Sequence, residues 1–170
     1  VGAESYRMAA LEVGDSFADF VGPLGRPSDL CELPLEELRA MKLCFIAGGV
    51  GTAPVYAQLK WLKSQGVTAD CIQGARTKDI LIMEKEMSEV SNLYICTDDG
   101  SYGINGNVCV ALQKLYDEGK RYDRVIAIGP MIMMKFACQL TKKLEIPTIV
   151  SMNPIMVDGT GMCGACRLVV

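Results

Sequence analysis

Asp158, Cys163 and Cys166 are the residues of this chain whose types and spacing most clearly could do chemistry. They stand in a glycine-rich stretch with four residues between the first two and two residues between the last two. Plant-type iron–sulfur loops place cysteines at this spacing, followed by one more distant cysteine. Glycines suit such a loop because the backbone must fold closely around the sulfur atoms and direct N–H groups at them. We therefore take these three residues as candidate metal ligands, with an oxygen donor in the place of the first cysteine.

Two other interpretations of the cysteine pair stay open, namely half of a zinc site and two free thiols. The chain contains no histidine, which excludes histidine-ligated metals and histidine-based catalysis within it. The sequence reaches Val170 without a fourth ligand after Cys166, and it begins at Val1 rather than at a methionine. We therefore expect a fragment of a longer protein, in which the metal-binding segment is truncated.

A second group of candidates forms a glycine-rich loop between an apolar run and a helical pattern. Gly49 and Gly51 would let the backbone approach a pyrophosphate, and Thr52 can cap the helix that follows. Pro54 falls in the first turn, where a missing N–H is harmless. The loop lacks the lysine of a phosphate-binding NTPase loop and the third glycine of the usual dinucleotide fingerprint, so a tight turn without a ligand is the alternative. The candidate nucleotide-binding residues here are Gly48, Gly49, Val50, Gly51, Thr52, Ala53 and Pro54.

Three further loops follow apolar runs and supply the remaining candidates. Arg76, with Lys78 beside it, can face the 2′-phosphate of NADP, whereas an acidic residue at this place would favour NAD. A solvated surface arginine is the alternative. Asp98 and Asp99 either contact a ligand or form an Asx-turn, and the methionines of the last loop also suit a core. The candidates are Gly74, Ala75 and Arg76, then Thr97, Asp98 and Asp99, then Gly129, Pro130 and Met131.

Apolar runs and helical patterns alternate along most of the chain. Parallel strands need long crossovers and bury both faces, so this alternation predicts an α/β fold with a doubly wound, five-stranded parallel sheet of Rossmann type. Ligands of such sheets bind beyond the carboxyl ends of the strands, where the glycine-rich loop and the three loops after it fall. The predicted strands are residues 43–47, 67–73, 92–97, 124–128 and 148–152, and the predicted helices are residues 52–65, 78–90, 106–118 and 131–145.

The first segment of the chain departs from this alternation. It is turn-rich, contains Gly22-Pro-Leu-Gly25 and continues through Pro27 and Pro34. We interpret it as a short β remnant followed by a linker. The expected parts are residues 1–42 from a β-domain, residues 43–152 as the α/β domain and residues 153–170 as the start of a metal-binding segment.

Composition excludes several classes of function. Half of the residues are apolar, which is typical of a globular protein. The net charge is −3 without a basic cluster, which argues against nucleic acid and anionic membranes as partners. No apolar run is long enough to cross a bilayer, and no signal pattern starts the chain. Several of the eight cysteines lie in apolar runs as small hydrophobes, so we expect a cytoplasmic protein in a reducing compartment.

Together these motifs resemble the ferredoxin–NADP reductase superfamily of flavoproteins over nearly the whole chain. Gly22-Pro-Leu-Gly25 is similar to the end of the family's FAD-binding barrel. The loop from Gly48 to Pro54 is similar to its nicotinamide and pyrophosphate loop. The loops after the second and third predicted strands are similar to its ribose-side loops, and the aspartate and two cysteines near the end match its [2Fe–2S] loop. Within the superfamily, the chain most resembles the alpha (flavin and [2Fe–2S]) subunits of bacterial and archaeal ferredoxin–NADP oxidoreductases of the sulfide dehydrogenase type.

The resemblance implies an NAD(P)H-dependent flavoprotein oxidoreductase in which hydride passes between NAD(P)H and FAD and electrons continue through a [2Fe–2S] cluster. The implied cofactors are NADP or NAD, with FAD and the cluster in the complete protein. The implied partners are a larger iron–sulfur and flavin subunit and ferredoxin or a similar electron carrier. No catalytic side chain is expected here, because the cofactors carry the chemistry.

Two residues depart from relatives within the superfamily. Many reductases have cysteine where this chain has Ile128. An isoleucine at this position suits the subfamily that the chain most resembles. The electron-transfer subunits of dihydroorotate dehydrogenase, which the chain also resembles, have cysteine where this chain has Asp158. Such a subunit is the first alternative function, and a redox-inert module that binds a nucleotide and zinc is the second.

Overall fold

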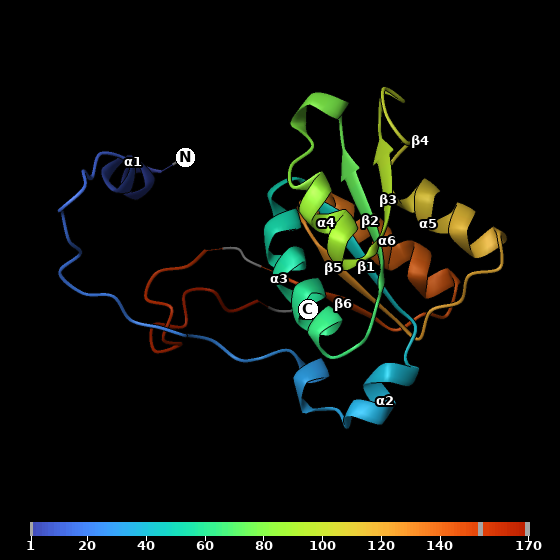
Figure 1. Ribbon diagram of the computed structural model, residues 1–170, viewed down its shortest axis with the longest axis horizontal. Coiled ribbons are helices and arrows are strands. Elements are labelled where there is room, and N and C mark those ends of the chain that lie inside the picture. The colour runs from blue at the N-terminus through green and yellow to red at the C-terminus, as the bar shows by residue number, and fades with distance from the viewer. Residues whose placement is uncertain (1, 153–154, 169–170) are drawn as a thin grey trace. The chain divides into compact units, whose positions relative to one another are not determined.

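The computed structural model describes residues 2–152 and 155–168. The chain divides into two compact units. The terminal unit is Val1–Pro27 with Ile155–Val170, and the sheet unit is Ser28–Pro154. The strands all belong to the sheet unit (Figure 1).

In the described part of the chain, six parallel strands form one open sheet in the order β4-β3-β2-β1-β5-β6. The predicted doubly wound parallel α/β fold is confirmed, with one strand more than the predicted five. The additional strand, β4, is only two residues long and pairs with the end of β3, so it leaves no apolar run in the sequence. The strands are β1 Leu43–Gly48, β2 Asp70–Ala75, β3 Asn92–Thr97, β4 Ile104–Asn105, β5 Arg124–Ile128 and β6 Thr148–Val150.

Two helices cover each face of the sheet. Helices α3 and α4 enclose one core cluster and α5 and α6 enclose the other (Figure 1). The predicted helix 78–90 is shorter than expected, because Met83 takes a left-handed conformation (φ 57°) that interrupts it. The helices of this unit are α2 Leu35–Ala40, α3 Thr52–Ser64, α4 Glu84–Val90, α5 Val108–Asp117 and α6 Met131–Lys143, with 3₁₀ turns at Asp29–Glu32, Gly49–Gly51 and Lys78–Ile80.

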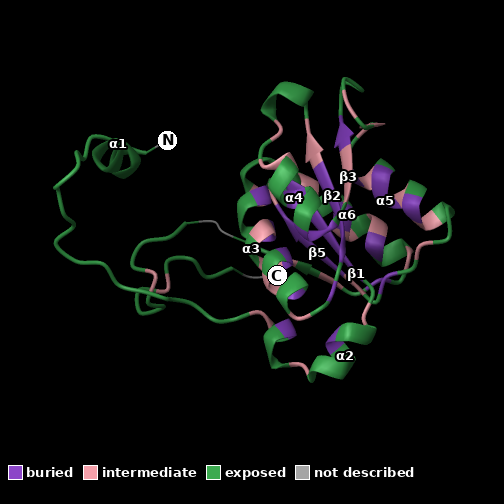
Figure 2. Cartoon of the chain, viewed as in Figure 1, coloured by how far each residue is buried: buried purple, intermediate pink, exposed green. Residues whose placement is uncertain are grey.

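The core is continuous from the central strand into the helices. Every residue of β1 is buried, as expected of a parallel strand covered on both faces (Figure 2). On α3 the side chains of Val55, Leu59 and Leu62 are fully buried at the helical spacing that predicted this helix. Complete burial of each such side chain stabilises the fold by about 1.5–3 kcal/mol. This packing fixes the start of α3 against the end of β1.

Helix α3 stops where the sequence predicts, at Gly66. This glycine has φ +81°, and its N–H donates to the carbonyl of Lys63 at 3.0 Å. The N–H of Val67 donates to the carbonyl of Leu62, also at 3.0 Å, which completes a Schellman motif. Gly119 closes α5 in the same way and directs the chain into β5.

The segment from residue 28 to residue 42 packs onto the sheet unit. Leu30 and Leu38 are each 2% exposed and belong to the core cluster of β1 and α3. Asp29 pairs with Arg124 at the start of β5. The sequence pattern placed a boundary at residues 42 and 43, whereas the contacts place it at residues 27 and 28, because the two leucines supply apolar surface that the sheet buries.

Among its described residues, the terminal unit holds one helix, α1 Ala3–Ala9, followed by turns. The sequence predicted a short β remnant here, but no strand occurs among residues 2–27. A strand requires the N–H and C=O groups of a neighbouring strand, and none pairs with this segment in the described part of the chain. Across the described residues, no helix has the length and apolar character needed to cross a membrane.

Candidate functional site

The predicted nucleotide-binding loops meet at one edge of the sheet. Strands β1, β2, β3 and β5 are parallel neighbours, so their carboxyl ends lie side by side. Gly48 is in register with Gly74, and Ala47 with Ile128. The structure therefore brings the glycine-rich loop, both loops after β2 and β3 and the turn after β5 to a common edge, where ligands of such sheets bind.

The glycine-rich loop leaves β1 and enters α3 within a single 3₁₀ turn. Gly49 has φ +53°, and a Cβ atom there would meet no atom within 4 Å. A Cβ atom at Gly51 would instead overlap the carbonyl group of Ile128 at the end of β5. Gly51 is thus required for packing between two strand ends, whereas Gly49 provides a left-handed backbone that faces open space.

The prediction that Thr52 caps α3 is wrong. Helix α3 begins at Thr52 itself, and its N-cap residue is Gly51. Because glycine has no side chain, no side-chain hydrogen bond caps this helix. Thr52 is fully buried, and its hydroxyl lies 3.5 Å from Nε2 of Gln73. Pro54 does fall in the first turn, as predicted. Since N–H groups in the first turn of a helix have no partner within the helix, this uncapped end suits a ligand oxygen.

Gln73 is a polar residue of this edge that the sequence analysis missed. Its side chain is buried, and Nε2 donates to the carbonyl of Ile82 at 2.7 Å. Its Oε1 has no hydrogen-bond partner among the described residues. Gln73 thereby ties β2 to the segment before α4. The signal for it was a glutamine at the last position of the predicted strand 67–73.

The loop after β3 is closed by its own hydrogen bonds. Thr97 is buried, and its hydroxyl accepts from the N–H of Tyr102 at 3.0 Å and donates to the carbonyl of Tyr102 at 2.8 Å. Asp99 accepts from the hydroxyl of Ser101 at 2.6 Å and from its N–H at 3.0 Å, and these two hydrogen bonds lower the pKa of Asp99. Asp99 therefore forms the predicted Asx-turn, while Asp98 beside it is exposed.

Hydrogen bonds also join the loops after β2 and β3. The N–H of Lys78 donates to Oγ of Ser101 at 2.9 Å, and the Lys78 ammonium lies 4.9 Å from the centre of the Tyr102 ring. The Tyr102 hydroxyl donates to Glu84 at 2.6 Å, which raises the pKa of Tyr102. Arg76 follows β2 directly and is exposed next to these contacts between the two loops. The two loops thus form one supported rim, and the Arg76 guanidinium on it has no hydrogen-bond or ion-pair partner in the described part of the chain.

The turn after β5 packs against the glycine-rich loop. A Cβ atom at Gly129 would crowd Met133 and the backbone of Gly48. Pro130 is the N-cap of α6, and Met131 begins the helix with 63% of its surface exposed. Met131 therefore faces solvent at the edge, although the core interpretation does hold for Met134, which is buried.

The candidate metal ligands lie in the terminal unit. Asp158 accepts hydrogen bonds from the N–H groups of Thr160 and Cys163, both at 3.1 Å. Although burial acts to raise the pKa of Asp158, the bond from the Cys163 N–H and those from Thr160 bring it below its ordinary value. The N–H of Ala165 lies 3.5 Å from Sγ of Cys163. These donors fit a loop that holds iron–sulfur ligands, but within residues 155–168 the three candidate side chains do not converge into a metal site.

Residues 45–139 match the family model of the oxidoreductase NAD-binding domain. The chain is 54% identical to a Clostridium beijerinckii protein named "Uncharacterized protein in adh 3'region", over all of this chain and 58% of that protein. It is 44% identical to the "Dihydroorotate dehydrogenase B (NAD(+)), electron transfer subunit homolog" of Thermotoga maritima, over all of this chain and 57% of that protein. The chain thus spans less than two thirds of the length of these relatives.

One solved structure is similar to nearly the whole chain. It is the structure of an NADH-dependent reduced ferredoxin-NADP oxidoreductase, which superposes with a TM-score of 0.82 at 39% sequence identity. The similarity covers 98% of this chain and 58% of that one.

Proposed function

Because the chain belongs to the oxidoreductase NAD-binding domain family, we propose that it is the NAD(P)H-binding part of a flavin- and iron–sulfur-dependent ferredoxin–NADP oxidoreductase subunit. The observation that carries the proposal is the left-handed Gly49, which faces open space at the carboxyl end of β1, directly before the start of α3. Backbone N–H groups and the helix dipole at such a point attract the pyrophosphate of a dinucleotide.

Each loop of this edge has a part in the proposed nucleotide site. The glycine-rich loop holds the pyrophosphate, the loops after β2 and β3 hold the adenosine side, and the turn after β5 lies beside the nicotinamide. The positive charge of Arg76 favours NADP over NAD. The proposed contacts are Gly48, Gly49, Val50, Gly51, Thr52, Ala53, Pro54, Gly74, Ala75, Arg76, Thr97, Asp98, Asp99, Gly129, Pro130 and Met131.

Thr52 and Asp99 contribute to this site indirectly. The Thr52 side chain is buried, and its backbone N–H donates to carbonyls of the preceding 3₁₀ turn, which fixes that turn to the start of α3. Asp99 fixes the shape of its own loop through Ser101. Both residues therefore position the backbone groups of the edge.

The remaining cofactors belong to the complete protein in this proposal. Hydride exchange between nicotinamide and FAD, and electron transfer through a [2Fe–2S] cluster, are the chemistry that these cofactors supply. Asp158, Cys163 and Cys166 are proposed as cluster ligands, because one carboxylate and two thiols share a loop in which N–H groups already point at Asp158 and Cys163. Residues 1–42 would supply the end of an FAD-binding domain and a linker, whose residues 28–42 pack onto the sheet unit. Residues 43–152 would bind NAD(P)H, and residues 153–170 would open the cluster segment.

The proposed partners are the proteins with which an electron-transfer subunit would exchange electrons. A larger iron–sulfur and flavin subunit would receive or supply the electrons, and ferredoxin or a similar carrier would exchange them in the cytoplasm. The second candidate function, an electron-transfer subunit of dihydroorotate dehydrogenase, is favoured by the name of the Thermotoga maritima relative. We rank it second because Asp158 stands where those subunits have cysteine.

The test of nucleotide binding is substitution of the left-handed glycine. Gly49→Ala places a Cβ atom on a backbone with φ +53°, which costs about 1–2 kcal/mol in that conformation. We expect the Kd for NADH and NADPH, measured by fluorescence titration of the complete protein, to rise roughly 5- to 30-fold.

Gly66→Ala is the matched control for this substitution. Gly66 also has positive φ, but it lies at the end of α3 remote in sequence from the loop. We expect this variant to lose stability and to keep its nucleotide affinity. Unchanged affinity in Gly49→Ala, or equal losses in both variants, would contradict a nucleotide site on the glycine-rich loop.

A further inference from the structure

The loop between β2 and α4, residues 76–83, carries Arg76 and Lys78 on the adenosine side of the proposed nucleotide site. The loop after β3 holds its first part. The carbonyl of Arg76 accepts from the N–H of Asp99 at 3.2 Å, and the N–H of Lys78 donates to Oγ of Ser101 at 2.9 Å. Both partners are themselves exposed loop residues. The geometry of residues 76–83 therefore also depends on how their far end is fixed.

Gln73 closes this loop at its base. Its Nε2 donates to the carbonyl of Ile82 at 2.7 Å, nine positions further along the chain. Gln73 is 1% exposed, and the same nitrogen lies 3.5 Å from the hydroxyl of Thr52, which is fully buried at the start of α3. One buried side chain of the sheet thus holds the end of the loop close to the start of α3.

The residues after Ile82 extend this contact to the rest of the rim. Met83 takes its left-handed conformation while packed against the core cluster of β1 and α3. A residue with a Cβ atom opposes that conformation, so the contacts around it must hold it in place. Glu84 then begins α4 and accepts from the Tyr102 hydroxyl at 2.6 Å, and the Tyr102 ring faces the Lys78 ammonium. The bond to Ile82 therefore fixes the inner end of a connected set of contacts.

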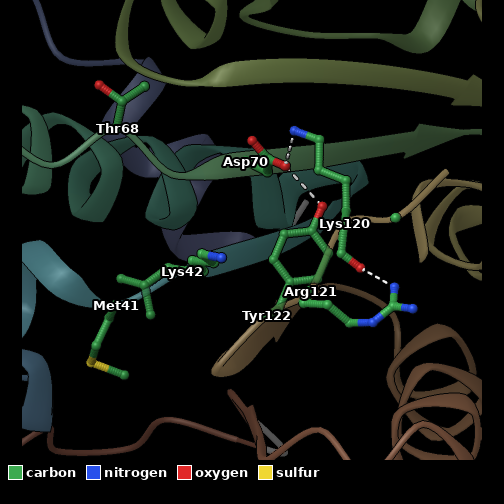
Figure 3. A pocket seen from close by; sticks show the side chains of 9 residues that line it. Met41, Lys42, Thr68, Asp70, Lys120, Arg121 and Tyr122 are labelled. Atoms are coloured by element: carbon green, nitrogen blue, oxygen red, sulfur yellow. Dashed lines mark hydrogen bonds and ion pairs between the residues drawn. The ribbon is translucent and has the colours of Figure 1, made fainter.

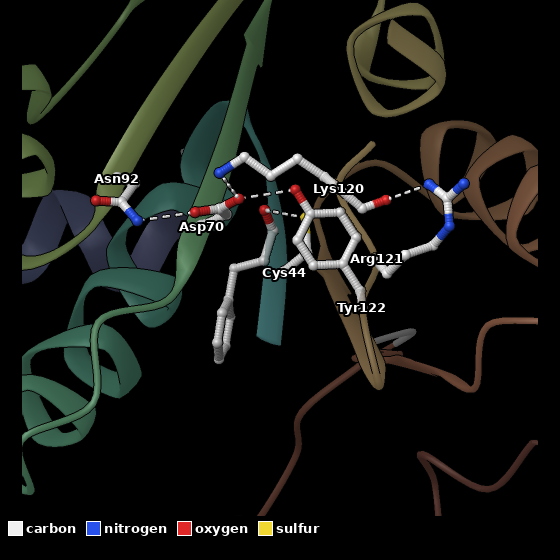
Figure 4. A network of polar contacts seen from close by, with 7 residues as sticks. Cys44, Asp70, Asn92, Lys120, Arg121 and Tyr122 are labelled. Carbon is white, nitrogen blue, oxygen red and sulfur yellow. Dashed lines mark hydrogen bonds and ion pairs between the residues drawn. The ribbon is translucent and has the colours of Figure 1, made fainter. Parts of the chain in front are cut away.

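The other buried polar side chain of β2, Asp70, provides a comparison at the amino end of the strand. The Tyr122 hydroxyl and the Lys120 ammonium both point at it, at 2.8 and 2.7 Å (Figure 3). The amide of Asn92 donates to it from the start of β3 at 2.9 Å (Figure 4). All three partners lie at or before the amino ends of β3 and β5. Asp70 thus joins strands away from the proposed site, whereas Gln73 holds a loop that belongs to it.

We propose that Gln73 is a positioning residue of the nucleotide site, which closes residues 76–83 at their base and so holds the adenosine side in its binding geometry. This inference rests on the proposed function. Because the loop is already ordered in the folded protein, less conformational entropy is lost when a nucleotide binds. The glycine-rich loop keeps its shape independently, since the N–H of Thr52 donates to the carbonyls of Gly49 and Val50.

The test is Gln73→Met in the complete protein, because methionine is similar in length and has no N–H donor. We expect the Kd for the adenosine nucleotides 5′-AMP and 2′,5′-ADP, measured by calorimetry, to rise roughly 3- to 10-fold. The Kd for inorganic pyrophosphate should stay unchanged. With NADH or NADPH and ferricyanide as acceptor, KM should rise by the same factor and kcat should not change, which is the pattern of lost binding without lost chemistry.

Tyr122→Phe is the matched control. It removes one buried hydrogen bond at the other end of β2 and keeps the ring. We expect it to lower the free energy of unfolding and to leave every Kd unchanged. Amide hydrogen exchange supplies a second readout, since residues 78–83 should exchange faster in Gln73→Met and not in Tyr122→Phe. Gln73→Asn keeps the amide but shortens its reach by one methylene group, so it should behave as Gln73→Met does.

The outcomes separate this inference from the proposed function. Unchanged affinity for both adenosine nucleotides in Gln73→Met and Gln73→Asn would overturn it. An equal loss of affinity for pyrophosphate, or the same losses in Tyr122→Phe, would overturn it as well, because Gln73 would then support the fold in general. If the unmodified complete protein bound none of these nucleotides, the nucleotide site itself would be refuted and the role of Gln73 with it.

Discussion

Arg76 is the residue at which we expect the choice between NADP and NAD to be made. It is exposed on the rim formed by the loops after β2 and β3. A charge-assisted contact with a 2′-phosphate contributes about 1.5–3 kcal/mol, so Arg76→Ala should raise the Kd for NADP roughly 10- to 100-fold and leave the Kd for NAD nearly unchanged. Titration of the complete protein with both nucleotides measures this, and equal losses would assign Arg76 a structural role only.

Single residues show how far the sequence alone could predict the site. The spacing of Gly49 and Gly51 predicted the tight turn between β1 and α3, because glycine reports a special backbone requirement at its own position, whereas nucleotide binding by this turn stays a prediction. Thr52 was predicted as a cap but is buried against Gln73, and Gln73 itself was missed. Residue type carries backbone preference, whereas the partners of a polar side chain depend on which distant segments the fold brings together.

At the level of elements, the ends of the helices provide a matched pair of tests. Gly66 and Glu145 both follow helix ends with positive φ, +81° and +57°. The N–H of Ile146 donates to the carbonyl of Thr141 at 2.9 Å, so the end of α6 has the same closing bond as the end of α3. Glutamate has a Cβ atom that opposes this conformation, and glycine does not.

We expect Gly66→Ala to lower the free energy of unfolding by about 1–2 kcal/mol. Glu145→Gly should raise it by about 0.5–1 kcal/mol, because relief of the left-handed conformation exceeds the added entropy of an unfolded glycine. Urea denaturation of the two variants beside the unmodified protein checks both signs. A loss of stability in Glu145→Gly would show that the glutamate side chain contributes a contact that outweighs its backbone conformation.

The elements also show which part of the fold the pattern of apolar residues determines. The predicted bounds of β3 and β5 are confirmed residue for residue. The run 67–73 predicted a strand three residues too early, because Val67 and Ala69 are buried in the connection after α3 without joining a ladder. An apolar run records burial, and burial does not distinguish a strand from a tightly packed turn.

At the scale of the whole molecule, the combination of motifs was more informative than any one of them. The predicted resemblance to the ferredoxin–NADP reductase superfamily is confirmed by the family model and by the match to the ferredoxin-NADP oxidoreductase structure. Each motif alone left an alternative, whereas the similarity to that structure covers 98% of this chain. The chain spans 58% of that structure and 57–58% of its first two relatives. The choice of NADP over NAD, the binding of FAD and the binding of an iron–sulfur cluster are therefore stated as proposals.

The proposed iron–sulfur cluster would link this chain to the rest of the electron path. Asp158 accepts from the N–H of Cys163, so its carboxylate is already turned toward the cysteine loop. If that carboxylate ligates iron, Asp158→Cys in the complete protein should keep the cluster and shift its reduction potential, because thiolate is a softer donor than carboxylate. Asp158→Ala should make the cluster labile, since the oxygen donor and the loop hydrogen bonds are lost together.

Asp158→Asn separates ligation from loop closure. An amide oxygen still accepts from the N–H groups of Thr160 and Cys163, but it is a poorer iron ligand than a carboxylate. Redox titration and visible spectra of the four proteins should therefore show a perturbed cluster in Asp158→Asn as well. An unchanged potential and an equally stable cluster in all three variants would mean that Asp158 is not a ligand, and the dihydroorotate dehydrogenase alternative would then lose the main observation against it.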